Sequence, residues 1–346
     1  MWGTVAQLKA EAEEHRRAWE AWHDIQRVLP ERSECAANGL TICSVAYRAR
    51  QCLELNDRLM RRLNPSVALP TWLLFDNNVE PEDAIPGTDP RFSVTRWPGG
   101  EFTRGYDHAL GIGRLLGRVR TRFLLILDPD CFVVMPDWIE RVHAHMLDHD
   151  LAFFGTPINP RRHNSYRYFP YMVCMFVDLA RVAARDLCFV PDVWRWRTNA
   201  MYRLRLSVAR MPKVGHAFRW LLTEQYRTNG WRIKAQFGRH PDVTHECVQP
   251  VWNIDEAIPR GSAKRLLHTL TPAVVSPVPK RADYCSPIGF AAMGAPDVAA
   301  LGWEEFVWKG RPFAFHVGSV HGKPGRYEAE LDAVVQKFLR AEELAA

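Results

Sequence analysis

The stretch from Phe123 to Leu127 constrains the fold more than any other part of this chain. It reads Phe-Leu-Leu-Ile-Leu, an unbroken apolar run with no polar residue for a solvent-facing side. A strand of this kind is buried on both faces, as strands are in the middle of a parallel sheet. The sequence therefore predicts a layered α/β protein with this strand near its centre.

Two acidic residues follow this strand directly: Asp128 and Asp130 flank Pro129, which keeps the chain extended and the carboxylates close. In an open α/β sheet, ligands bind at the carboxyl ends of the strands. Two hard oxygen ligands at such a position suit Mg²⁺ or Mn²⁺, held together with a substrate diphosphate. The alternative is an ordinary Asp-Pro-Asp turn. The second apolar stretch, 131–134, favours the metal site.

The rest of the chain alternates strands with helices, which predicts a doubly wound, mostly parallel central sheet flanked by helices. Strands are expected over residues 40–46, 71–75, 91–96, 151–154 and 312–318. Helices are expected over residues 4–28, 51–63, 104–118, 136–149 and 327–344. The first helix is either a packed appendage or a dimer contact.

The composition is that of a globular protein in a reducing compartment. A chain of 346 residues suggests one large α/β domain or two domains. The net charge of +6 fits an anionic ligand or a membrane surface, and is too weak to imply nucleic acid. The eight cysteines form no Cys-x-x-Cys pair, so we expect buried free thiols. With no signal peptide pattern and no apolar stretch near the ~20 residues of a membrane span, we expect a cytoplasmic protein.

Membrane association stays open because of residues 194–220, which hold seven Arg or Lys residues, no acidic residue and several interleaved aromatic residues. One interpretation is an interfacial surface that draws the protein to an anionic leaflet. The other is a solvated pair of helices whose aromatic residues anchor in the core.

The order of these features resembles the bacterial family 2-like glycosyltransferases of the GT-A fold. The resemblance covers residues 38–160 and is most specific over residues 123–139, which contain the Asp-Pro-Asp sequence and a Pro-Asp-Trp helix start. It implies a metal-dependent enzyme that moves a sugar from a nucleotide-diphosphate sugar to an acceptor hydroxyl of a glycan, a lipid-linked glycan or a small molecule. We divide the chain into an N-terminal helical appendage (1–36), a nucleotide-sugar-binding α/β half (37–160), an acceptor-binding half with the basic aromatic segment (161–325) and a C-terminal helix (326–346).

The resemblance also implies roles for single residues. Ala46 and Tyr47 would lie along the nucleoside, and Asp76 would bond the base or the ribose. Asp128 would face the ribose, or the metal through water. Asp130 would bind the metal that bridges the two phosphates.

Further residues would complete this site. His108, with Asp107 beside it, falls where the family often keeps a polar donor contact. His316 would be a late metal or phosphate ligand, unless it is a satisfied histidine within a strand. Lys323 and His321 could contact phosphate from the following loop, and the alternative for both is a solvated loop.

The catalytic base is the least certain carry-over from the family. An inverting transferase needs a carboxylate within hydrogen-bond reach of the acceptor hydroxyl. Glu224 is the first candidate, against the alternative of a surface acid on a helix, and Asp192 is another. The family normally has a Glu-Asp pair, and here Gln225 stands in place of the Asp. This departure leaves the inverting stereochemistry open.

Two other functions compete with this one. A nucleotidyltransferase acting on a sugar phosphate shares the sheet and the acids, but residues 44–50 lack the glycines of its phosphate loop. A non-catalytic, transferase-like binding module fits the uncertain base and does not explain the Asp-Pro-Asp sequence.

Overall fold

The computed structural model describes residues 5–31, 37–97, 102, 105–160, 166–191, 228–252, 281–318 and 328–345. Its strands are β1 (Ala37–Ala46), β2 (Thr71–Asp76), β3 (Ser93–Arg96), β4 (Thr121–Leu127), β5 (Cys131–Val133), β6 (Leu151–Gly155), β7 (Cys174–Asp178), β8 (Thr244–Cys247), β9 (Gln249–Pro250), β10 (Glu304–Trp308) and β11 (Arg311–His316). Its α-helices are α1 (Val5–Val28), α2 (Arg50–Leu63), α3 (Tyr106–Leu116), α4 (Trp138–Asp148), α7 (Trp231–Phe237) and α10 (Glu328–Ala345).

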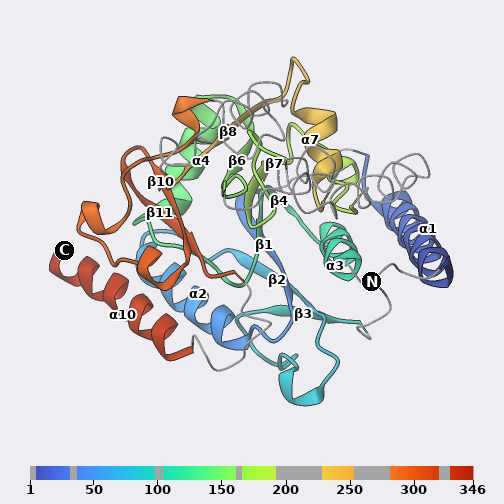
Figure 1. Cartoon of the computed structure of the whole chain (residues 1–346), viewed down its shortest axis with the longest axis horizontal. Helices are drawn as coiled ribbons and strands as arrows, with labels where there is room; N and C mark the ends of the chain where they lie inside the picture. The colour runs from blue at the N-terminus through green and yellow to red at the C-terminus, as the bar shows by residue number, and fades with distance from the viewer. Residues whose placement is uncertain are drawn as a thin grey trace, which may run out of the picture.

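A seven-stranded sheet forms the centre of the molecule (Figure 1). Its order is β3-β2-β1-β4-β7-β6-β8, and β7 runs antiparallel to both of its neighbours while the other pairs are parallel. The predicted α/β fold with a mostly parallel central sheet is therefore confirmed. Because β1, β2, β3 and β4 run in one direction, their carboxyl ends meet at the same edge.

The central strand β4 is buried on both faces, as its apolar sequence predicts. Phe123, Leu125 and Leu127 belong to the core that includes residues of α2, α4 and α10. Leu124 and Ile126 belong to the core that includes residues of α1, α3 and α7. Successive side chains of a strand point to opposite faces, so one strand supplies both cores and the sheet separates two helical layers.

A smaller antiparallel sheet, with the order β5-β11-β10-β9, shares the core of α2 and α10. β10 and β11 form a hairpin whose two turn residues, Lys309 and Gly310, have φ of 50° and 71°. Two consecutive positive φ values are typical of the tight turn that joins twisted antiparallel strands. The ring of Phe315 stacks on Trp303 at 5.5 Å and on Phe338 of α10 at 5.8 Å, so the closing helix is anchored on this sheet.

The N-terminal helix α1 packs on α3. Gly113 of α3 lies under Trp22, and a Cβ atom at this glycine would come within 2.8 Å of the indole ring. His15 Nδ1 lies 2.8 Å from the hydroxyl of Tyr106, which ties a second turn of α1 to the same helix. The glycines of α3, which weaken its helical pattern in the sequence, are thus places of close packing.

Several elements were not expected from the sequence. β8, β9 and α7 are short, and β10 begins with two glutamates that hide a strand pattern. α4 begins at Trp138, two residues later than the proline that was expected to open it. The four-part division of the chain stays a prediction, although the central sheet itself continues past residue 160 through β7 and β8.

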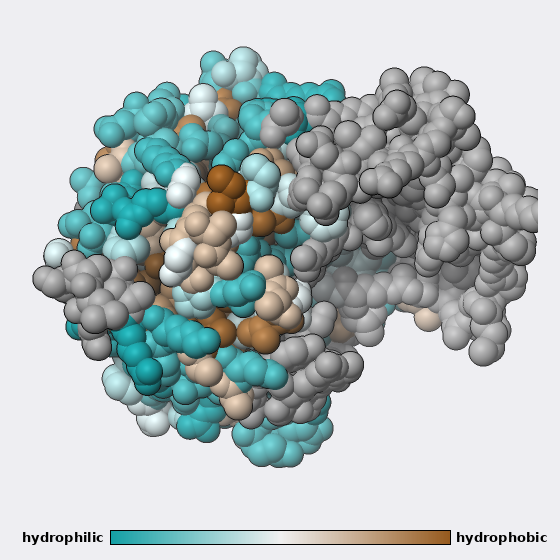
Figure 2. All heavy atoms as spheres, turned by 60° about the vertical axis from the view of Figure 1, so that its left-hand side comes forward, coloured by the Kyte–Doolittle hydropathy of each residue, from teal (hydrophilic) through white to brown (hydrophobic). Residues whose placement is uncertain are grey.

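The surface of the described residues is mixed in polarity. Figure 2 shows one face, on which hydrophilic side chains surround a smaller central area of apolar ones. Among the helices of the described ranges, none combines the length and the low polarity that crossing a bilayer requires.

Candidate functional site

The carboxyl ends of three parallel strands bring the predicted donor-side residues to one edge of the sheet. Ala46 and Asp76 end β1 and β2 and are paired in register. Asp128 follows β4, whose residue Ile126 pairs with Cys43 of β1. These residues therefore lie at one edge of the sheet, and their contact with a nucleoside stays a prediction.

The Asp-Pro-Asp turn is fixed by its backbone and by a buried amide. The Asp128 N–H donates to the carbonyl of Val173 at 2.9 Å, and the Cys131 N–H donates back to the Asp128 carbonyl at 2.9 Å. Asn56 of α2 donates from Nδ2 to the Pro129 carbonyl at 2.8 Å. These bonds hold both ends and the middle of the turn, so the two carboxylates are carried on a rigid support.

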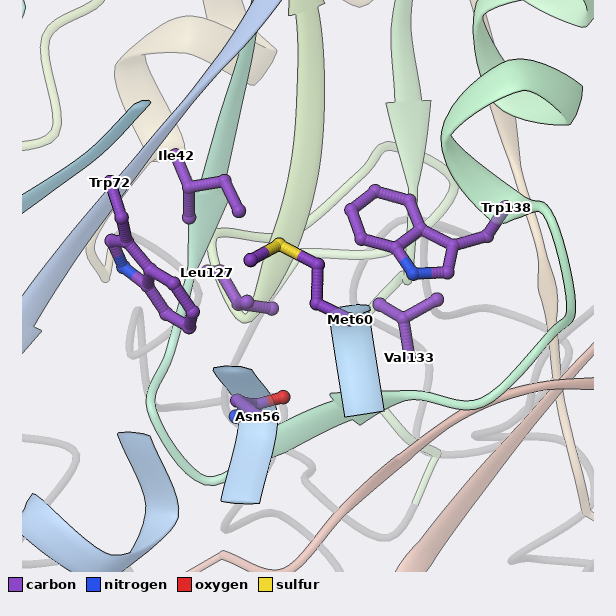
Figure 3. A pocket seen from close by; sticks show the side chains of 7 residues that line it. All are labelled: Ile42, Asn56, Met60, Trp72, Leu127, Val133 and Trp138. Carbon is purple, nitrogen blue, oxygen red and sulfur yellow. The ribbon is translucent and has the colours of Figure 1, made fainter. Parts of the chain in front are cut away.

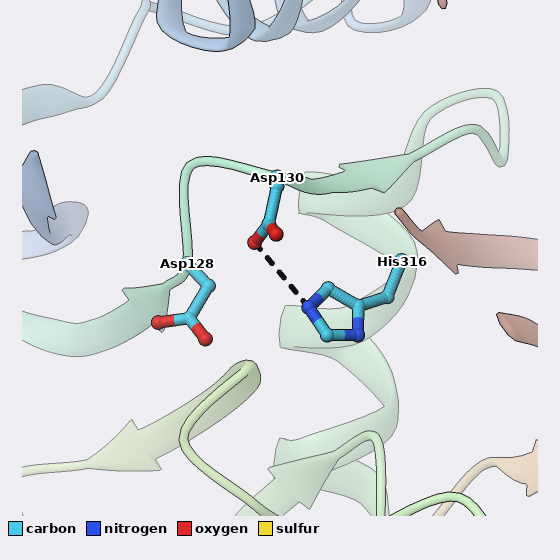
Figure 4. A group of neighbouring side chains, drawn as sticks. All are labelled: Asp128, Asp130 and His316. Atoms are coloured by element: carbon cyan, nitrogen blue, oxygen red, sulfur yellow. Dashed lines mark ion pairs between the residues drawn. The ribbon is translucent and has the colours of Figure 1, made fainter. Parts of the chain in front are cut away.

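His316 reaches this turn because the second sheet begins there. β5 starts one residue after Asp130 and pairs with β11, which places His316 directly opposite Cys131. The Val317 N–H donates to the Asp130 carbonyl at 3.0 Å and closes the ladder. His316 Nε2 then lies 3.3 Å from Asp130 Oδ1 (Figure 4).

Asp128, Asp130 and His316 form a compact group of ligand atoms. One ligand atom from each lies within 4.8 Å of the other two. Asp130 and His316 are buried, whereas Asp128 is half-buried, so the group is closed on one side and open on the other. Carboxylate oxygens and an imidazole nitrogen form a donor set suited to Mn²⁺, and two carboxylates with water suit Mg²⁺.

The electrostatics of this group fit a divalent cation. His316 Nδ1 lies 2.8 Å from Glu304 Oε2, so carboxylates flank the imidazole ring on two sides. Burial lowers the pKa of His316, but Asp130 and then Glu304 outweigh it and raise the pKa to about 10. His316 therefore carries an extra proton beside the carboxylates at neutral pH. A divalent cation in place of that proton would balance more of their negative charge.

His108 approaches the same group from α3. Its Nε2 lies 3.3 Å from Asp128 Oδ1, and both side chains are about one-quarter exposed, at 25% and 23%. This contact places His108 beside the more open of the two carboxylates. Its predicted role as a donor contact stays a prediction.

The carboxylate of Asp76 is occupied by the loop that follows β2. Its Oδ2 accepts from the Ile85 N–H at 3.0 Å, and its Oδ1 accepts from the Asn78 side chain at 2.7 Å. Tyr47, by contrast, is 38% exposed at the end of β1, with the Arg48 guanidinium 5.6 Å from its ring centre. Of the two, Tyr47 is the side chain that a planar ligand can reach without rearrangement.

Several predicted residues lie outside the described residues. These are Glu224, Asp192, Lys323, His321 and the basic aromatic segment 194–220. The proposed base and the phosphate contact from the last loop therefore stay predictions.

Sequence reasoning missed Glu304 and Asn56. If the two strands are paired residue by residue back from the Lys309-Gly310 turn, with one bulge, Glu304 lies opposite His316. The turn was therefore a sequence signal for Glu304. Asn56 has no such signal, because the sequence around a polar residue in a helix does not indicate that its side chain contacts a turn elsewhere in the chain.

A small pocket lies directly beneath the turn (Figure 3). It is lined by Ile42, Asn56, Met60, Trp72, Leu127, Val133 and Trp138. Met60 and Asn56 come from adjacent turns of α2 and share this space, which otherwise holds apolar side chains of the core. The pocket is part of the support under the site.

No protein-family model matches this chain, and no curated protein matches it in sequence. A mannosyltransferase from Pyrobaculum calidifontis, solved with GDP-Man and Mn²⁺, aligns at 11% identity over 97% of this chain and 96% of its own, with a TM-score of 0.36. S. aureus TarS 1-349 aligns at 8% identity over 57% of this chain and 72% of its own, with a TM-score of 0.33. Mouse xyloside xylosyltransferase 1 aligns at 9% identity over 62% and 86%, with a TM-score of 0.30. Likenesses at this level do not bear on function.

Proposed function

We propose that this chain is a metal-dependent glycosyltransferase, similar to the bacterial family 2-like enzymes of the GT-A fold. It would move a sugar from a nucleotide-diphosphate sugar to an acceptor hydroxyl on a glycan, a lipid-linked glycan or a small molecule, with inversion. One observation carries the proposal: Asp128, Asp130 and His316 converge at the carboxyl edge of a parallel sheet, where such folds bind ligands.

The three side chains differ in how they would serve a cation. Asp130 and His316 are buried and would hold it from the protein side, whereas Asp128 is half-buried and borders the open side where a diphosphate would arrive. Bound Mn²⁺ or Mg²⁺ would supply charge neutralisation to the leaving diphosphate.

The edge of the sheet supports a nucleoside beside the metal group. Ala46, Tyr47 and Asp76 lie at the ends of β1 and β2, next to β4, and would contact the base and ribose. His108 would steady Asp128 or contact the donor, and Lys323 would contact phosphate. Glu224, or else Asp192, would take the proton of the acceptor hydroxyl.

The test measures whether a nucleotide stabilises the protein only when metal is present. We expect nucleoside diphosphates with Mn²⁺ to raise the melting temperature of the full chain, because a ligand that binds only the folded state stabilises it. Asp130→Asn should abolish this shift. Asp178→Asn is the matched control, because Asp178 is also buried and pairs with Arg122 at the other end of β4.

Other outcomes would favour other functions. A preference for nucleoside triphosphates would favour the nucleotidyltransferase, and no response to any nucleotide would favour a binding module. For the chemistry, Glu224→Gln should stop turnover while leaving the metal-dependent shift intact. Unchanged turnover in that variant would move the base to another residue.

A further inference from the structure

We propose that Glu304 is a positioning residue for the metal site: it fixes the orientation and the tautomer of His316, so that Nε2 is the nitrogen offered to the cation. The inference deepens the metal-dependent function proposed above and rests on it. Glu304 begins β10, whereas Asp128 and Asp130 lie in the turn between β4 and β5, and His316 ends β11.

The position of Glu304 is set by the β10–β11 hairpin. The two strands pair back from the Lys309-Gly310 turn with one bulge between Phe306 and Val307, and Glu304 is the cross-strand partner of His316. Glu304 Oε2 lies 2.8 Å from His316 Nδ1, and the two side chains are only 12% and 4% exposed. A carboxylate accepts and does not donate, so Nδ1 carries the proton of this bond.

The neighbouring glutamate shows that this placement is specific. Glu305 points to the opposite face of β10, as the alternation of a strand requires. There its carboxylate accepts from the backbone N–H groups of Phe290 at 3.0 Å and Ala299 at 3.3 Å. Of two adjacent acids, one therefore supports a loop and the other faces the imidazole of the metal site.

The bond has a direct chemical consequence. A neutral imidazole carries one proton, and the nitrogen without it is the one that can ligate a metal. Because Glu304 holds the proton at Nδ1, a cation would displace the proton of Nε2, and the lone pair it binds would be on the nitrogen 3.3 Å from Asp130. A hydrogen-bonded carboxylate behind the ring also makes the imidazole a stronger donor, and losing such a partner typically weakens metal affinity about 10- to 100-fold.

A second histidine–carboxylate pair in the same chain provides a contrast. His145 Nε2 lies 2.9 Å from Glu246, and its Nδ1 lies 3.2 Å from the Lys309 ammonium. Both ring nitrogens of His145 are thus engaged by the protein, and one partner is a cation. The carboxylate contact is similar in length to that of the Glu304 pair, but the other ring nitrogen of His145 faces a cation instead of a second carboxylate with which it could share a metal.

The test measures Mn²⁺ affinity of the full chain without nucleotide, from the free Mn²⁺ signal in electron paramagnetic resonance. Glu304→Gln keeps a hydrogen-bond acceptor, and we expect it to weaken Mn²⁺ binding by about tenfold or less. Glu304→Leu removes the acceptor, and we expect a loss toward about 100-fold. The matched control Glu246→Gln should bind Mn²⁺ within twofold of the wild type.

A spectroscopic signature separates orientation from general destabilisation. Electron spin echo measurements detect the ¹⁴N of an imidazole bound to Mn²⁺, and we expect this signal in the wild type and in Glu304→Gln. It should be lost in Glu304→Leu when Mn²⁺ is raised to saturate the weaker site.

The outcomes distinguish this inference from the function on which it rests. Wild-type Mn²⁺ affinity in both Glu304 variants would overturn the positioning role alone, and so would equal losses in the two variants, because these would assign the effect to charge. A wild-type protein that binds no Mn²⁺ would overturn the metal-dependent function as well.

Discussion

At the residue scale, the metal group depends on side chains that do not belong to it. Asn56 is the clearest case, because its side-chain amide donates a hydrogen bond to the Pro129 carbonyl in the middle of the Asp-Pro-Asp turn. A buried carbonyl that loses its donor costs about 1–3 kcal/mol. The turn can recover part of this cost only by shifting, and a shift would move Asp128 and Asp130 relative to His316.

We therefore predict that Asn56→Ala lowers both the stability and the Mn²⁺ affinity of the chain. Stability should fall by about 1–3 kcal/mol in denaturant unfolding, and calorimetric titration should show weaker Mn²⁺ binding. Met60→Ala is the control, because Met60 lines the same pocket without bonding to the turn (Figure 3). It should destabilise by about 2–5 kcal/mol and leave the Mn²⁺ affinity unchanged. Equal loss of affinity in both variants would show that the pocket acts through stability alone.

At the element scale, α4 carries a half-buried histidine whose surroundings make folding sensitive to pH. His143 stacks on Phe123 of β4, with ring centres 4.1 Å apart and planes inclined by 17°. Its Nε2 has no hydrogen-bond partner within the described part of the chain. Burial lowers the pKa of His143 to about 4, against a smaller upward effect of Asp178. The folded state thus keeps this ring neutral where the unfolded chain would protonate it.

The sign of the pH dependence follows from this difference. Between pH 6.5 and 4, the unfolded chain binds a proton at His143 that the folded chain refuses, so stability falls as the pH falls through that window. The contribution amounts to at most about 3.5 kcal/mol, at ~1.4 kcal/mol per pKa unit. His143→Phe should reduce the loss of unfolding free energy between pH 7.5 and 5 in urea titrations. A loss as large as that of the wild type would show that other groups carry the acid sensitivity.

The contact between α1 and α3 yields a prediction with a control at Gly117, the residue that caps the end of α3. A Cβ atom at Gly113 would lie 2.8 Å from the buried Trp22 ring, whereas at Gly117 the nearest atom would be 3.6 Å away. We expect Gly113→Ala to destabilise by about 1–3 kcal/mol through overpacking. Gly117→Ala should be neutral or slightly stabilising, because alanine favours the helix. Thermal unfolding compares the two variants. Equal melting temperatures would mean that α1 shifts to accommodate the added methyl group without loss of stability.

The elements also show what the sequence could and could not predict. β4 was predictable because an unbroken apolar run has few alternatives, and Asp128 and Asp130 followed because a parallel strand end is a ligand site. His316 was predictable only by resemblance, since its place depends on the pairing of β11 with β5. Glu304 depends on a bulged hairpin register, and Asn56 on the packing of a helix over a turn. Such long-range contacts leave little trace in local patterns, which is why they were missed.

At the scale of the whole molecule, the site lies where two sheets meet. Asp128 ends a strand of the parallel sheet, and Asp130 precedes a strand of the antiparallel one, so a single turn joins both. The pairing of β11 with β5 places His316 beside that turn, although the two are far apart in the sequence. Helix α10 packs on the antiparallel sheet through Phe338. A cation at this point would bind side chains from both sheets at once.

This geometry predicts that Mn²⁺ protects both sheets, not one, from local opening. Separating β11 from β5 breaks the bond between the Val317 N–H and the Asp130 carbonyl and pulls His316 away from the carboxylates. If the cation binds only when these elements are together, Mn²⁺ at 100 times its dissociation constant adds about 2.7 kcal/mol to that opening. Hydrogen exchange of amides in β5 and β11 should then slow by up to about 100-fold.

Asp130→Asn should remove the effect of Mn²⁺ at both strands. Protection limited to the turn after β4, with β11 exchanging as before, would mean that His316 does not share the cation and that the site belongs to the parallel sheet alone.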